Sequence, residues 1–137
     1  MWICPKCQRP FQTTNQWHIC GEKTIDDIFA GKPDNVLLAF DDVLLATADW
    51  DPNVITPARK ALVFSNKRAW LIVRPMRKLL ELSFYSESVL TGAAIHKSGP
   101  AMKGSKKFRH SIRLHGPDEL TPEILDLLQI GYNYAMR

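Results

Sequence analysis

Hydrophobic residues recur at helical spacing soon after Gly31, while aspartates fall between them. This pattern is typical of a helix with one buried and one wet face, and it predicts a helix over about residues 33–47. A short helix before it is predicted to start at Thr24, whose hydroxyl can accept a free backbone N–H, and to end at Gly31. The apolar stripe of the longer helix consists of Val36, Leu37, Phe40, Val43, Leu44 and Thr47.

A closing helix is indicated by its start signals. Thr121 can cap the helix, Pro122 suits its first turn, and Glu123 favours the positive end of the helix dipole. Apolar residues then continue at three- and four-residue steps up to Tyr134.

Between these helices the period of the pattern changes from helical to alternating. Segments rich in Val, Ile, Leu and aromatic residues are separated by short polar turns, which favours antiparallel strands. In the last of them Phe108, His110 and Ile112 face one way and the arginines the other. The segment 49–57 holds two prolines and is predicted to be a loop. Strands are predicted at 61–65, 69–74, 79–85, 93–97 and 107–114.

The elements together predict an α+β fold with two layers, in which helices cover one face of an antiparallel sheet of about five strands. We expect two parts, a zinc knuckle over residues 1–23 and an α+β domain over residues 24–137. At 137 residues the chain is long enough to bury a core.

All three cysteines of the chain lie near its N-terminus, together with one histidine. Structural zinc sites use four N or S ligands, and a Cys-x-x-Cys pair followed by a His-x-Cys pair supplies that number. A full set of four ligands leaves no open position for water, so we expect a structural Zn²⁺ ion. The alternative is a set of unrelated thiols. The predicted ligands are Cys4, Cys7, His18 and Cys20.

Charge is distributed unevenly along the chain. Residues 52–116 carry thirteen Lys and Arg but two Asp and Glu, whereas both flanking regions are acidic. A surface of this kind can bind the phosphates of DNA or RNA. It can equally consist of side chains that keep strand edges and turns soluble. The candidate nucleic-acid-binding residues are Arg59, Lys60, Lys67, Arg68, Arg74, Arg77, Lys78, Lys107, Arg109 and Arg113, and Trp70 or Tyr85 would be the aromatic residue that stacks on bases.

An alternative function is a ligand- or protein-interaction domain, with an apolar pocket or a homodimer interface. The pocket residues would be Trp50, Trp70, Phe84 and His110. His110 is expected in the core, and an enzyme is favoured only if this histidine lies in a cleft beside Glu81 or a hydroxyl group. The chain has no P-loop, dinucleotide-binding or serine-hydrolase motif, so a non-catalytic role is expected.

The location in the cell is expected to be the cytoplasm, with no membrane association. The longest apolar runs are far shorter than a bilayer-spanning helix, and the first residues lack the pattern of a secretory signal.

Several strings of the sequence resemble a bacterial family known as domain of unknown function 5655. The most specific are WICPKCQRPF at 2–11 and NQWHIC at 15–20, and PARKALVF at 57–64, RPMRKL at 74–79 and GPDEL at 116–120 agree. The resemblance covers nearly the whole chain and implies no established activity. It implies an association with restriction-endonuclease-like or predicted transport proteins, to which similar domains are attached.

Overall fold

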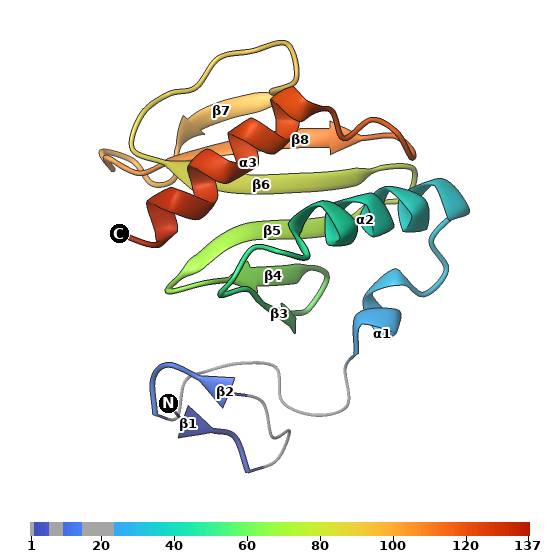
Figure 1. Cartoon of the computed structure of the whole chain (residues 1–137), viewed down its shortest axis with the longest axis horizontal. Helices are drawn as coiled ribbons and strands as arrows, with labels where there is room; N and C mark the ends of the chain where they lie inside the picture. The colour runs from blue at the N-terminus through green and yellow to red at the C-terminus, as the bar shows by residue number, and fades with distance from the viewer. Residues whose placement is uncertain (1, 6–9, 15–23) are drawn as a thin grey trace.

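The structure is a computed structural model, which describes residues 2–5, 10–14 and 24–137 (Figure 1). Its main element is a six-stranded antiparallel sheet with the strand order β3-β4-β5-β6-β8-β7. The α+β prediction is confirmed. The strands are β3 (Val54–Pro57), β4 (Leu62–Ser65), β5 (Ala69–Pro75), β6 (Leu80–Ser86), β7 (Lys97–Pro100) and β8 (Phe108–Leu114).

Three helices accompany the sheet: α1 (Ile25–Phe29), α2 (Asp34–Thr47) and α3 (Pro122–Ala135). Figure 1 shows α2 and α3 over one face of the sheet, with α1 beyond its β3 edge. The start signals act as expected, since the Thr24 hydroxyl accepts from the Asp27 N–H and the Thr121 hydroxyl accepts from the Ile124 N–H. Gly31 follows α1 with φ at 75°, a value that glycine adopts without strain.

The strand count of about five was wrong by one, and one predicted strand is displaced. The predicted loop 49–57 contains β3, because the run from Val54 to Thr56 pairs with β4 in spite of the prolines around it. The strand predicted at 93–97 lies instead at Lys97–Pro100. Gly99 and Pro100 are poor strand formers, and β7 accommodates them because it is an edge strand.

The core lies between the sheet and the two long helices. Leu82 of β6 and Ile112 of β8 are paired neighbours, and both point to the helices with at most 1% exposure. The alternation predicted for the last strand is confirmed by its burial pattern. On α2, however, Ala39 belongs to the core, while Leu37 of the predicted stripe is exposed.

A chain of aromatic rings runs through this core and connects the sheet to α2 and α3. Neighbouring centroids are 4.5 to 6.4 Å apart. Trp70 occupies an irregularity in the β4–β5 pairing and lies at the centre, with its indole N–H donating to Asn53 at 3.1 Å. The Tyr132 hydroxyl donates to the Pro52 carbonyl at 2.8 Å. The rings belong to Phe29, Phe40, Phe64, Trp70, Trp50 and Tyr132.

Near the N-terminus, β1 (Trp2–Ile3) pairs with β2 (Pro10–Phe11) in a separate two-stranded sheet. Gln12 donates from its side chain to the carbonyl of Lys67 at 2.6 Å, which connects this segment to the β4–β5 turn. Within the described residues, none of the helices is long and apolar enough to cross a membrane.

Candidate functional site

The face of the sheet opposite α2 and α3 carries polar side chains in the centre of the sheet. We call it the open face and define it by Arg74 of β5, Glu81 and Ser83 of β6, and Arg109 and Arg113 of β8. Strand register places Arg74, Glu81 and Arg113 in one row across three neighbouring strands. Side chains in such a row stand on the same side of the sheet about 5 Å apart, so they can interact.

Glu81 holds two of these arginines. Its Oε1 accepts from Arg74 Nη2 at 2.9 Å, and its Oε2 accepts from Arg113 Nε at 3.3 Å. The carboxylate is 10% exposed, whereas the side chains of Arg74 and Arg113 are 48% and 33% exposed. One N–H of each guanidinium is bonded to Glu81, so the rest of each guanidinium fork remains outside this bond. Glu81 therefore orients both arginines, while the other N–H groups of each guanidinium take no part in this pairing.

Arg109 is held in a similar way two residues further along the sheet. Its Nη2 donates to the Ser83 hydroxyl at 3.2 Å, and Ser83 is 2% exposed beneath it. Beside it, the Lys107 ammonium lies 4.3 Å from the centre of the Tyr85 ring. The open face thus carries three oriented guanidiniums and one buried carboxylate.

The other predicted basic residues lie at the two ends of the sheet and outside the open face. Arg59 and Lys60 are in the β3–β4 turn, and Arg77 and Lys78 are in the β5–β6 turn at the same end. Three more, Lys67, Arg68 and Lys107, lie at the opposite end. The basic block is therefore divided between the open face and both of its ends.

Charge is separated between the two layers of the fold. Residues 54–114, which form the sheet, carry thirteen Lys and Arg against two Asp and Glu. Residues 24–53 and 115–137, which contain the helices, carry two against eleven. Neither α2 nor α3 contains a single Lys or Arg. The sheet layer is cationic, and the helical layer that covers its other face is anionic.

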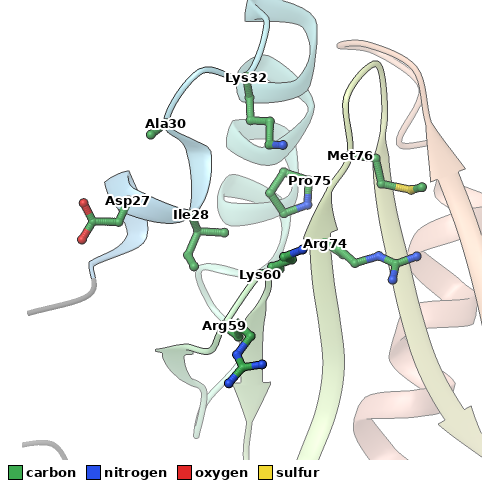
Figure 2. Close-up of a pocket in the computed structure, with 9 residues that line it drawn as sticks. All are labelled: Asp27, Ile28, Ala30, Lys32, Arg59, Lys60, Arg74, Pro75 and Met76. Atoms are coloured by element: carbon green, nitrogen blue, oxygen red, sulfur yellow. The ribbon is translucent and has the colours of Figure 1, made fainter. Parts of the chain in front are cut away.

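A hollow of about 370 Å³ lies at one end of the sheet, between α1, the β3–β4 turn and the end of β5 (Figure 2). Its size falls in the range of small-molecule sites. The lining has four basic side chains and one acidic side chain, Asp27, together with apolar residues. The lining residues are Asp27, Ile28, Ala30, Lys32, Arg59, Lys60, Arg74, Pro75 and Met76.

The acidic residue of this hollow is already engaged in the helix cap. Asp27 Oδ2 accepts from the backbone N–H of Thr24 at 2.8 Å. Figure 2 shows its carboxylate on the side of α1 away from the sheet, whereas Lys32 extends towards the strand of Pro75. The Asp27 carboxylate is therefore directed away from Lys32 across the hollow.

The four predicted pocket residues lie in the core. Trp70, Phe84 and His110 are completely buried, and Trp50 is half-buried against Trp70. None of them lines the hollow between α1, the β3–β4 turn and the end of β5. Trp70 is consequently a packing residue, and of the two aromatic residues considered for base stacking only Tyr85 is partly exposed.

His110 is held between two serine hydroxyls on the helix side of the sheet. Ser86 Oγ is 2.7 Å from Nε2, and Ser98 Oγ is 2.6 Å from Nδ1. Because Ser86 Oγ donates its proton to the Ser88 carbonyl at 2.7 Å, it accepts from Nε2–H. Burial lowers the pKa of His110 and so favours the neutral ring, in which Nδ1 accepts from the Ser98 hydroxyl. This assigns a neutral Nε2–H tautomer to His110.

The enzyme hypothesis requires His110 to lie in a cleft beside Glu81 or a hydroxyl group. Hydroxyl groups are present, since a serine lies on each side of the His110 ring. Glu81, the other proposed neighbour, lies on the opposite face of the sheet. His110 itself is 0% exposed. The geometry is that of a satisfied core histidine.

Stability is expected to fall when the pH drops below about 6.5, the ordinary pKa of histidine. Burial lowers the pKa of His110 in the folded state, and a hydrogen bond to the Ser88 backbone partly offsets this. The unfolded chain therefore binds a proton at a higher pH than the folded chain does, so acid favours unfolding until the folded pKa is also passed. Urea denaturation at pH 7.5 and 5.5 should show the loss. The loss of stability between pH 7.5 and 5.5 should be smaller in His110→Gln. It should persist in the control His96→Gln, which changes an exposed histidine. An equal loss in both variants would contradict the attribution of the pH dependence to His110.

The predicted zinc ligands are incompletely covered by the structure. Cys7, His18 and Cys20 lie outside the described residues. Cys4 directly follows β1 and is 3% exposed. Among the described residues there is no group of three His, Cys, Asp or Glu side chains that could hold a metal ion. Cysteine thiolates are among the ligands that structural zinc sites use.

Three contributors to these sites were missed at the sequence level: Glu81 as the partner of two arginines, Lys32 as a lining residue, and the serines around His110. Glu81 had one available signal, because it is an acidic residue between Leu80 and Leu82 in a strand that contains no other charged residue. Lys32 had none, since it comes from an acidic region and joins Lys60 through the fold alone.

In comparisons with known proteins, a family model described as a domain of unknown function matches residues 25–135. No curated protein and no solved structure matches the chain.

Proposed function

The chain belongs to the DUF5655 family, a domain of unknown function, and from its geometry we propose a non-catalytic module that binds the phosphate backbone of nucleic acid. The open face is the proposed contact surface. The N-terminal segment is proposed to hold a structural zinc ion.

The separation of charge between the layers is the observation that supports this proposal most. A cationic sheet opposite an anionic helical layer gives the molecule one attractive side towards a polyanion and one repulsive side. Such a field orients the protein before contact, so that the open face meets the phosphates.

The arrangement of the three arginines adds a specific reason. Arginine presents a planar fork that matches two phosphate oxygens, and restricting its motion in advance reduces the entropy lost on binding. Glu81 and Ser83 restrict Arg74, Arg113 and Arg109 in this way. Glu81 lowers the positive charge of the open face by one, but it orients two arginines.

Arg109→Ala combined with Arg113→Ala is expected to weaken binding of a labelled oligonucleotide uniformly across sequences. Each lost phosphate contact should also reduce the slope of log affinity against log salt by about 0.7 to 0.9. Fluorescence anisotropy at several salt concentrations, with single-stranded and duplex DNA and RNA, measures both effects.

The matched control for this experiment is Arg137→Ala. Arg137 is a basic residue on the helical side, where it pairs with Glu87 at 2.7 Å, and this pairing lowers the pKa of the Glu87 carboxyl. Its removal should change affinity much less. Absence of binding by the unmodified protein at ~50 mM salt would rule out the proposed function.

The alternative of a protein-interaction domain, including a homodimer, has one feature in its favour. Three leucines of α2 are exposed, and Leu45 is 77% exposed. Sedimentation velocity over a range of protein concentrations distinguishes a self-associating chain from a monomer. Self-association that Leu45→Glu abolishes would favour this alternative.

A further inference from the structure

We propose that the hollow at the end of the sheet binds a phosphomonoester, the doubly charged phosphate found at a nucleic-acid end or on a free mononucleotide. This inference rests on the proposed function, because it adds an end-binding site to the phosphate-binding open face. The hollow is the one described above, between α1, the β3–β4 turn and β5.

The charge of the lining favours a dianion. Lys32 and Lys60 reach the hollow from the α1–α2 connection and the β3–β4 turn, and Arg59 and Arg74 also line it, with the Arg74 guanidinium paired to Glu81. The Asp27 carboxylate already caps α1 and lies on the far side of that helix. A phosphomonoester carries a charge of about −1.5 to −2 at pH 7, whereas an internal phosphodiester carries one negative charge. Two ammonium groups at one hollow, those of Lys32 and Lys60, therefore favour the terminal group.

Lys32 and Lys60 are available for such a ligand. Within the described part of the chain, neither ammonium takes part in an ion pair or a side-chain hydrogen bond. Lys60 is exposed and Lys32 is half-buried, so both can reach a bound group without leaving a partner.

The shape of the site also favours a chain end. Figure 2 shows α1 as one wall and the strands as the opposite wall, with α2 behind. Two buried residues, Ile28 and Pro75, supply apolar surface inside the hollow. A volume of about 370 Å³ accommodates a phosphate with an attached sugar or base, since small-molecule sites start near 300 Å³.

Arg74 connects this hollow with the open face. Its side chain lines the hollow, while its guanidinium bonds to Glu81 on the open face. Figure 2 shows the guanidinium directed away from α1. A strand whose internal phosphates follow Arg113 and Arg74 would therefore bring its terminal phosphate to Lys32 and Lys60.

The test compares two oligonucleotides of one sequence, one with a 5′-phosphate and one with a 5′-hydroxyl, each labelled at the 3′ end. Charge-assisted hydrogen bonds from two lysines should make the phosphorylated form bind about tenfold more tightly to the unmodified protein. Lys32→Ala with Lys60→Ala should reduce this ratio to about one. Lys103→Ala with Lys106→Ala removes the same charge from the exposed β7–β8 loop and should leave the ratio unchanged.

The possible outcomes separate this inference from the proposed function. Salt-dependent binding of both oligonucleotides with equal affinity, together with no binding of adenosine 5′-monophosphate, would overturn the inference and leave the proposed function in place. Failure to bind either one would overturn the proposed function. Calorimetry with adenosine 5′-monophosphate distinguishes the two ligand sources: binding that the Lys32/Lys60 variant loses supports a free mononucleotide as occupant. The inference is wrong if the protein neither binds the 5′-phosphorylated oligonucleotide more tightly than the 5′-hydroxyl form nor binds adenosine 5′-monophosphate.

Discussion

Replacing Trp70 by alanine is expected to lower the free energy of unfolding by about 3 to 5 kcal/mol, the usual cost of truncating a buried aromatic residue. The indole is completely buried and contacts the rings of Trp50, Phe64 and Tyr132. Its loss would leave a cavity between the sheet and α3 and would remove the hydrogen bond to Asn53. Since whole domains are stable by about 5 to 15 kcal/mol, much of the stability would disappear.

Urea denaturation followed by circular dichroism measures this change. Trp50→Ala is the matched control, because Trp50 is half-buried at the edge of the same ring cluster and should cost clearly less. Equal losses in the two variants would show that the centre of the aromatic chain is not where the structure places it. The result matters for function because the contact between Trp70 and Tyr132 packs α3 against one face of the sheet. The open face is the opposite face.

Replacing Cys20 by alanine is expected to abolish zinc binding while the α+β domain stays folded. Structural zinc sites have apparent binding free energies of about 10 to 16 kcal/mol, which depend on a complete set of four ligands. Among the residues that the structure describes, the core between the sheet and helices starts at position 28, so we expect it to persist without the metal. Mass spectrometry under non-denaturing conditions gives the metal content, and a thermal melt gives the stability of the sheet.

Thr14→Ala is the matched control for this experiment, because Thr14 belongs to the same N-terminal part of the chain and is not among the predicted ligands. It should leave both the zinc content and the melt unchanged. Two observations would contradict the prediction in different ways. An unmodified protein that contains no zinc when purified from zinc-supplemented medium would remove the zinc proposal itself. Global unfolding of the Cys20→Ala variant would instead show that the metal supports the whole domain.

The open face shows how far sequence reasoning about the site could go. Alternation along β8 places Arg109 and Arg113 on one side of the strand, and this was visible in the sequence. The pairing of Arg113 with Glu81 spans 32 residues, and it depends on β8 lying next to β6. No local pattern contains that information, because strand order is decided by long-range packing.

The sequence by itself determined the class of fold, the three helices, the capping residues of α1 and α3, and the buried side of β8. It did so because helix caps and hydrophobic periods act between residues close in the chain. It did not determine the edge strands, where β3 was missed and β7 displaced, since few apolar side chains mark an edge.

Tertiary structure alone decided which groups meet. It brought Lys32 to Lys60, placed Glu81 between two arginines, and enclosed His110 between Ser86 and Ser98. It also turned an uneven charge along the chain into a cationic sheet under an anionic helical layer. The physical reason is that these contacts arise from strand register and layer packing, which depend on the free energy of the whole core and not on any single segment.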